Sequence, residues 1–163
     1  LALAAAGCSA DQSVTPPPGV RALAVRSAGG STHNIGLYAV MGSGFGGVNV
    51  TPTAEDHGTF HVQGEVHIRG ASPNTTYIVQ RAPDLNVADP TCTGPWISFP
   101  IPNPGPVVTL TTSTGGAGAA HFALAVGGAF VSGRSFNVRF RVIDSVLDPT
   151  SVLMSDCITV TVK

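Results

Sequence analysis

Hydrophobic and polar residues alternate along much of this chain with the period of two that a β-strand imposes. The alternation is clearest over residues 135–143, where every second residue is Phe or Val and the residues between them include one Asn and two Arg. Over residues 158–162, Ile and Val alternate with Thr in the same way. Because successive side chains of a strand point to opposite faces, both segments predict strands with one buried face.

The same pattern, interrupted by 20 Gly and 13 Pro, predicts an all-β chain. Hairpins are expected at Thr114–Gly118 and across Asp144–Thr150, and many short strands of this kind are typical of an antiparallel β-sandwich of about eight or nine strands. The predicted strands are Val20–Arg26, Asn34–Met41, Gly47–Thr51, Thr59–Arg69, Thr76–Arg81, Ile97–Phe99 (the weakest), Val107–Ser113, Ala119–Val126, Ser135–Ile143 and Val152–Val162. The predicted core comprises Leu23, Val25, Phe60, Val62, Val66, Ile68, Tyr77, Val79, Leu110, Phe122, Leu124, Phe136, Val138, Phe140, Val142, Ile158 and Val160.

One segment indicates the kind of sandwich. Residues 72–79 read Ser-Pro-Asn-Thr-Thr-Tyr-Ile-Val, which resembles the corner segment of fibronectin type III domains. The resemblance implies an immunoglobulin- or fibronectin-like sandwich in which the Tyr77 hydroxyl bonds back to the preceding corner, the tyrosine corner. Ala71 stands where that family usually has Leu, and the chain after Tyr77 is longer than a type III domain, so the strand count is not carried over. The alternative is an ordinary Pro-Asn turn before a strand.

The charge content narrows the set of partners. Charged residues make up 10 % of the chain, the net charge is −1 and Lys163 is the only lysine. Nucleic-acid binding needs a surface rich in Lys and Arg, so this composition argues against it and against electrostatic docking to a membrane. It suits neutral partners, such as a protein or a glycan, or other copies of the chain in a homo-oligomer.

The first residues predict where the chain works. An apolar run of Leu and Ala ends at Ala5-Ala6-Gly7-Cys8, which resembles the lipobox of bacterial lipoprotein signal peptides. That resemblance implies lipidation of Cys8 and an extracytoplasmic, lipid-anchored protein whose only membrane contact is the anchor. The alternatives are a plain secretory signal cut near Ala6 or Ala10, or a structural Ala-rich segment. We expect residues 1–8 to be a signal tail, 9–19 a Pro-rich linker and 20–163 one domain without a membrane-spanning helix.

The other two cysteines, Cys92 and Cys157, are available to pair with each other. Oxidising compartments favour disulfides, and this one would close a loop of ~65 residues. Two free buried thiols are the alternative, and the spacing is a poor match to a structural zinc site.

One His/Glu set is a candidate metal site. Glu65 and His67 lie two residues apart on one face of a predicted strand, and His121 can join them if its strand is adjacent. Such ligands suit Zn²⁺ or Cu²⁺. The alternative is the polar outer face of a half-solvated sheet, which needs no metal.

Other catalytic motifs are weak. Residues 42–47 match G-x-G-x-x-G, but a strand-like segment follows where the dinucleotide motif needs a helix. G-x-S-x-G does not occur, and Glu55 and Glu65 are the only glutamates. The sequence therefore does not favour an enzymatic function, and it implies no cofactor beyond the candidate metal.

The long segment Pro83–Pro106 carries the only tryptophan, Trp96. We expect Trp96 to cover the core or pack on a disulfide. If the domain binds a partner, this loop is the expected contact surface. The function most in keeping with the sequence is a non-catalytic binding or structural-interaction module of a bacterial cell envelope. The alternatives are a metal-binding protein or metal-dependent enzyme, and a self-assembling surface subunit.

Overall fold

The computed structural model describes residues 32–40, 42–52, 59–99, 107–128, 130–144 and 151–162. Cys8 and the predicted strand Val20–Arg26 lie outside these residues. Within them, ten strands follow one another along the chain: β1 (His33–Ala39), β2 (Phe45–Pro52), β3 (Phe60–Arg69), β4 (Thr76–Asp84), β5 (Ile97–Ser98), β6 (Thr109–Thr111), β7 (Gly118–Val126), β8 (Ser135–Ile143), β9 (Ser151–Met154) and β10 (Ile158–Thr161).

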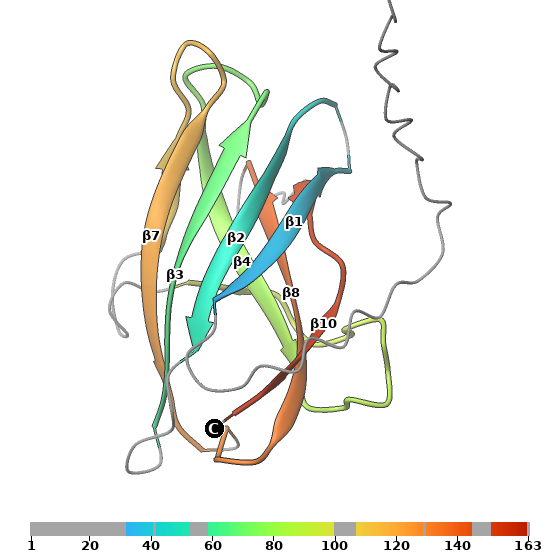
Figure 1. Ribbon diagram of the computed structural model, residues 1–163. Coiled ribbons are helices and arrows are strands. Elements are labelled where there is room, and N and C mark those ends of the chain that lie inside the picture. The colour runs from blue at the N-terminus through green and yellow to red at the C-terminus, as the bar shows by residue number, and fades with distance from the viewer. Residues whose placement is uncertain are drawn as a thin grey trace, which may run out of the picture.

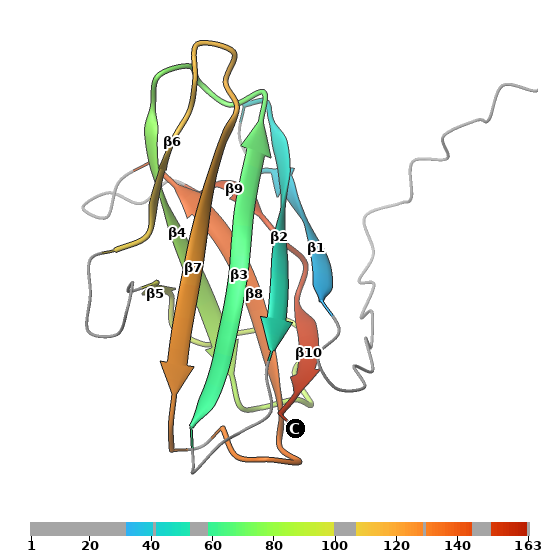
Figure 2. The same cartoon turned by 60° about the vertical axis from the view of Figure 1, so that its left-hand side comes forward.

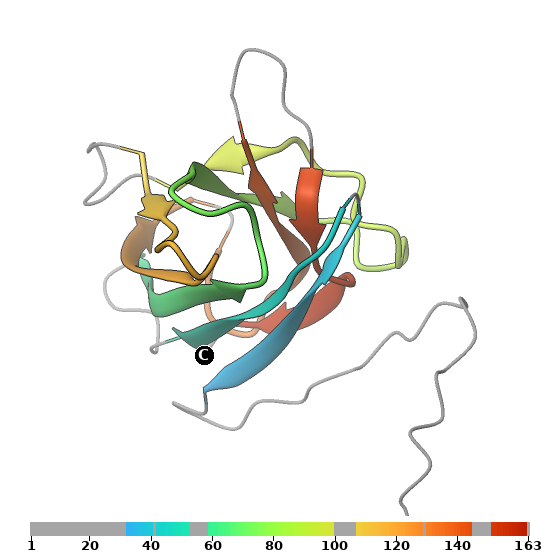
Figure 3. The same cartoon turned by 90° about the horizontal axis from the view of Figure 1, so that it is seen from above.

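The strand pairings are antiparallel and link the strands into one sheet that curls back on itself (Figure 1). The order is β5-β4-β8-β9-β1-β2-β3-β7, while β10 also pairs with β8 and β6 with β4. Strands β1, β2, β3 and β7 form one wall, and β4 and β8 lie in the wall behind it (Figure 2). Seen from above, the two walls curl around the interior (Figure 3), an arrangement consistent with a sandwich-like fold.

The core lies between these walls because each strand turns every second side chain inward. Val48 and Val66 from one wall and Val79 and Val142 from the other are fully buried. Aromatic rings join the two walls, since the Phe99 ring lies 4.4 Å from that of Phe122 and the Phe60 ring 6.1 Å from that of Phe136, measured between centroids. Such close aromatic packing adds to the free energy gained by burying apolar area.

The predicted all-β antiparallel class is confirmed, but the last predicted strand, Val152–Val162, is two strands. Three residues, Ser155–Cys157, separate β9 from β10, whereas only Arg139 and Phe140 lie between the β8 residues that pair with Met154 and Ile158. This extra residue is a bulge, which shifts the alternation by one position. Leu153 is therefore buried before the bulge, and Ile158 and Val160 after it.

The two expected hairpins have different outcomes. β8 and β9 pair across Asp144–Thr150 as a hairpin. At Thr114–Gly118 a tight turn is present, in which the Ser113 N–H donates to the Ala117 carbonyl at 2.8 Å. This turn joins strands with different partners, since β6 pairs with β4 and β7 with β3. The expectation of a paired hairpin there is wrong, because the turn connects opposite ends of the curled sheet.

The Tyr77 side chain has the contact that the tyrosine-corner resemblance implies. Its ring is buried, and its hydroxyl accepts a hydrogen bond from the Ser72 N–H at 3.1 Å. Thr112, which directly follows β6, contacts the same corner. Its hydroxyl donates to the Ser72 carbonyl and accepts from the Thr75 N–H. The corner before β4 is thus held to the end of β6 by side chains as well as by the strand ladder.

Candidate binding face

The outward side of β1, β2, β3 and β7 carries aromatic, charged and polar side chains together. We call this surface the outer face. It presents three kinds of group: aromatic rings, polar side chains that accept and donate hydrogen bonds, and small residues between them. Its members are Gly36, Tyr38, Phe45, Gly47, Asn49, Thr51, Gln63, Glu65, His67, Ala119, His121 and Ala123.

The centre of the outer face is a cross-strand row of polar groups. The strand register places Asn49 of β2 opposite Glu65 of β3, and Glu65 opposite His121 of β7. Side chains in directly opposed positions are close enough to act on one ligand together. A shallow groove of about 510 Å³ follows this row and extends to Thr51 and Gln63. The row supplies an amide, a carboxylate and an imidazole within one groove.

The structure brings two of the three predicted metal ligands together and turns the third away. Glu65 and His121 are register partners on β3 and β7. The His67 ring instead lies toward β2, where a Cβ added to Gly47 would be 2.9 Å from the His67 Cε1 atom. Among the described residues, no three His, Cys, Asp or Glu side chains are grouped closely enough to hold a metal ion.

Two exposed aromatic residues lie at one end of the outer face. Tyr38 is 61 % exposed and Phe45 is 60 % exposed, and they are register partners on β1 and β2. A Cβ added to Gly36 would be 2.6 Å from the Tyr38 hydroxyl, so the tyrosine ring extends along the face over this glycine. The two rings and the polar row lie on the same side of the sheet, and β2 carries both Phe45 and Asn49.

Sequence reasoning missed this aromatic pair for an identifiable reason. The predicted strand began at Gly47 and left Phe45 out, whereas β2 begins at Phe45. The glycines that suggested a loop serve the turn, since Gly42 and Gly44 have φ of +73° and +124°. The alternation of Phe45, Gly47, Asn49 and Thr51 with the residues between them could have predicted that the strand begins at Phe45 and that these four residues point outward.

Trp96, expected to cover the core or pack on the disulfide, contacts two arginines of β8. Its ring lies on the outward side of β8, with the Arg141 guanidinium 4.3 Å and the Arg139 guanidinium 4.9 Å from the ring centroid. The Arg141 Nε donates to the Gln80 Oε1 at 2.8 Å. The Arg141 pKa is lowered mainly by burial and to a smaller extent by the neighbouring Arg139 charge. Trp96 is half-buried, and its ring takes part in these two cation–π contacts. Residues 100–106 of the predicted contact loop lie outside the described part of the chain.

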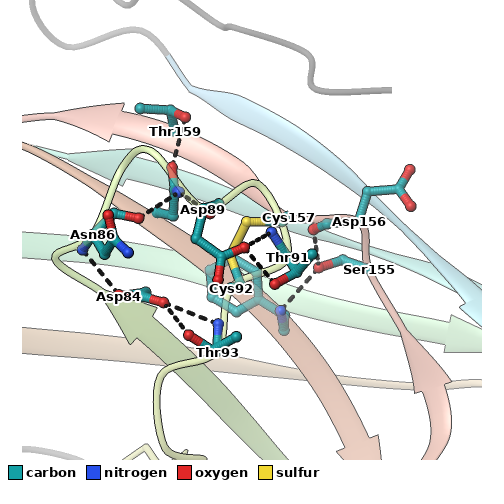
Figure 4. Close-up of a disulfide and its surroundings, with 12 residues drawn as sticks. Asp84, Asn86, Asp89, Thr91, Cys92, Thr93, Ser155, Asp156, Cys157 and Thr159 are labelled. Carbon is teal, nitrogen blue, oxygen red and sulfur yellow. Dashed lines mark hydrogen bonds between the residues drawn. A yellow bond between two sulfur atoms is a disulfide. The ribbon is translucent and has the colours of Figure 1, made fainter. Parts of the chain in front are cut away.

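The expected disulfide between Cys92 and Cys157 is present, with a Cα–Cα distance of 5.7 Å. It joins the loop after β4 to the bulge between β9 and β10 (Figure 4). Hydrogen bonds shape this loop: the Asp84 carboxylate accepts from the Asn86 N–H and from the N–H and hydroxyl of Thr93, each at 2.9 Å. These hydrogen bonds stabilise the charged carboxylate and so lower the Asp84 pKa, and the bond from the Asn86 backbone has the largest effect.

The chain matches no protein-family model, no curated protein sequence and no solved structure. The fibronectin-like resemblance therefore rests on the corner at Tyr77 alone. In the described part of the chain, no helix is long and apolar enough to cross a membrane.

Proposed function

We propose that this protein is a non-catalytic binding module of the extracytoplasmic space and that its outer face binds a glycan. The observation that carries the proposal is the exposed pair Tyr38 and Phe45 on the same face as the polar row Asn49–Glu65–His121. Adjacent exposed aromatic rings leave apolar area in water, and patches of this kind mark interaction sites.

The chemistry of the face matches the chemistry of a sugar. A sugar ring has apolar C–H groups on its faces and hydroxyl groups around its edge. Aromatic rings that lie along a sheet face cover the C–H groups, while an amide, a carboxylate and an imidazole can pair with the hydroxyls. The small residues Gly47, Ala119 and Ala123 lie between these groups and leave room for an extended chain beside them.

Two further features support work outside the cytoplasm. The Cys92–Cys157 disulfide forms in oxidising compartments. The lipobox-like segment ending at Cys8 would anchor the domain to an envelope through a lipid. On this proposal, the Pro-rich residues 9–19 hold the binding domain away from the membrane.

The test is depletion of the full chain from solution by insoluble peptidoglycan, chitin and cellulose, followed by glycan-array screening. We expect binding to at least one of these polysaccharides and its loss in the double variant Tyr38→Ala/Phe45→Ala. The matched control is Leu85→Ala, which removes an exposed apolar side chain from the loop after β4. Absence of saccharide binding, or equal binding by the double variant, would refute the proposal.

A second candidate, self-assembly through strand addition, rests on a separate observation. In the described structure the nine-residue strand β7 has a ladder on one side only, with β3. An unpaired strand edge without lysine is a template for another strand, and β6 lies close to the start of β7 at Gly118. Sedimentation velocity over a wide concentration range tests this candidate: a size that grows with concentration and falls in Ala125→Lys supports it, and a constant monomer excludes it.

A further inference from the structure

An apolar cavity of about 170 Å³ lies between the two walls of the curled sheet. It occupies the end where β1, β3 and β8 begin and where β2, β4 and β7 end, the lower end in Figure 1. β1 contributes Ile35 to its lining, and β10 contributes Ile158 and Val160. Unfilled space in a core forfeits contacts of the side chains around it, so apolar side chains that enter this cavity would stabilise the fold.

A free edge of β1 borders this cavity. From His33 to Tyr38 the strand pairs with β2, whereas on its other side only Tyr38 and Ala39 pair with β9. β9 and β10 follow each other along one edge of β8, because β4 occupies the other edge. The lower part of β1 therefore faces β10 (Figure 1), and no ladder joins these two described strands.

The free edge offers backbone groups to another strand. The Val40 N–H donates to the Val152 carbonyl at 3.0 Å. Because the backbone groups of a strand alternate between its two edges, Asn34 and Gly36 direct their N–H and C=O groups to the same edge as Val40. Neither residue has a partner strand on that edge among the described residues. An open edge of this kind is a template for one more strand.

The segment that precedes β1 has the pattern of such a strand. Val20–Arg26 lies outside the described residues, and residues 27–32, which include Gly29 and Gly30, connect it to β1. A short connection that contains glycine is typical of a β-hairpin, in which two consecutive strands pair side by side. Within the segment, Leu23 and Val25 alternate with small or charged residues.

We propose that the end of this segment, Leu23–Arg26, pairs with the free edge of β1 as a hairpin and inserts Leu23 and Val25 into the apolar cavity. The lining of the cavity is predominantly apolar and so matches these two side chains. The short connection favours the segment of the same chain over that of another copy, because it holds the segment beside this edge at a high effective concentration.

The side-chain period sets the register of this hairpin. Ile35 and Leu37 are buried, inward residues of β1 along the free edge. A loop of odd length, such as residues 28–32, places Val25 opposite Ile35, and the same register places Leu23 opposite Leu37. Opposed residues share a face, so both side chains point inward. A shift of one residue would turn both to the solvent and bring an arginine inward, which a buried face opposes. Pairing ends at Leu37, because the next residues of β1 pair with β9.

Two other segments outside the described residues adjoin the cavity, and both suit it less. Residues 53–58 lie between two strands that line it, but they include Glu55 and Asp56 and no large apolar side chain. Residues 100–106 contain four prolines, and proline cannot donate to a strand ladder. Of the three segments, Leu23–Arg26 is the one that combines alternating apolar side chains with a full set of backbone donors.

A cross-strand disulfide tests the placement and the register. In the proposed register Arg26 and Asn34 are directly opposed, at the Cα separation that a disulfide needs. In the full chain carrying Cys8→Ser, we expect Arg26→Cys/Asn34→Cys to form a bond within one chain on mild oxidation. The matched control is Val25→Cys/Asn34→Cys, whose side chains point to opposite faces in this register and should remain reduced. Peptide mapping by mass spectrometry identifies the bonds.

Urea denaturation of the full chain tests the burial of the two side chains. Leu23→Ser and Val25→Ser should each raise the equilibrium constant of unfolding at least about tenfold, because each removes a buried apolar side chain. The matched control is Ala24→Ser, which points outward from the same segment and should change this constant less than about threefold.

Three outcomes would overturn the proposal. The first is a cross-link of the Arg26→Cys/Asn34→Cys variant between two chains, which would assign the cavity to the segment of a second copy. The second is no cross-link in this variant, or one that forms equally well in the control, which would mean that the segment has no such register. The third is an equal effect of the three serine substitutions on unfolding, which would mean that Leu23 and Val25 are not buried.

Discussion

At the scale of single residues, polar side chains occupy buried positions where they hold neighbouring segments. Asn137 of β8 is 1 % exposed, and its Nδ2 donates to the Asp89 carbonyl at 2.7 Å while its Oδ1 accepts from the Thr159 hydroxyl at 2.7 Å. A buried amide satisfied in this way ties the loop after β4 to β8 and β10. The same principle makes Arg81 unusual, since its Nη1 has no such partner.

The Tyr77 hydroxyl gives the first prediction at this scale. Tyr77→Phe removes the acceptor of the Ser72 N–H and should lower the free energy of unfolding by about 1 kcal/mol. Urea denaturation measures the change. Tyr38→Phe, at an exposed ring, is the control and should leave stability unchanged. Equal stabilities of Tyr77→Phe and the unmodified protein would reduce the corner to an ordinary turn.

Asp84 gives the second prediction, which concerns pH. Its folded-state pKa lies below the usual value because the charged form accepts hydrogen bonds from Asn86 and Thr93. A lowered folded pKa contributes stability above the unfolded-state pKa of about 3.9, and that stability is lost as pH falls through the folded value. The melting temperature of Asp84→Asn should therefore lie below that of the unmodified protein near pH 7 and approach it in strong acid. Asp156→Asn, at an exposed aspartate, serves as the control; a gap that does not close in acid would contradict this account.

At the scale of elements, the disulfide and the bulge act together. The bulge at Ser155–Cys157 turns the chain so that both β9 and β10 pair with β8. The Ser155 N–H donates to the Phe140 carbonyl, and the Phe140 N–H donates to the Ser155 hydroxyl, both at 2.9 Å. The bulge is thus bonded to the central strand, and Cys157 within it is bonded to Cys92.

The third prediction follows from this covalent link. The disulfide closes a loop of 65 residues, and the chain-entropy model assigns such a closure about 4 kcal/mol. The double variant Cys92→Ser/Cys157→Ser should lose roughly that much free energy of unfolding under non-reducing conditions. Adding reductant to the unmodified protein should produce a similar loss. A melting curve that neither change affects would show that the link does not constrain the unfolded chain.

At the scale of the whole molecule, stability should be distributed unevenly over the curled sheet. β8 pairs with β4, β9 and β10, whereas the described ladders of β7 involve β3 alone. β1 and β9 join the two walls through only two register pairs. The most persistent structure is therefore expected around β8 and the earliest opening along β7.

Hydrogen exchange provides the fourth prediction. Amides of β8 should exchange most slowly, and those of β7 that point away from β3 should exchange fastest among the long strands. The measurement is repeated at low and high protein concentration. Protection of β7 that rises with concentration would indicate strand addition between copies, and protection of β7 equal to that of β8 at every concentration would contradict the uneven distribution.

By itself the sequence determined the fold class, most of the strands and the availability of Cys92 and Cys157 for one disulfide. These follow from local causes, namely the period of two in side-chain direction, turn residues at the breaks and the count of cysteines. The sequence also predicted that Glu65 and His121 lie on the outward, polar face of their strands, because both follow the alternation of polar positions. Only the tertiary structure decided which strands are neighbours, that His67 turns toward β2, and that Trp96 packs on Arg139 and Arg141. It also decided that Tyr38 meets Phe45 and that Ile35 and Val160 line one cavity. These arrangements depend on the pairing of residues far apart in the chain, and alternation within one strand carries no information about its neighbours.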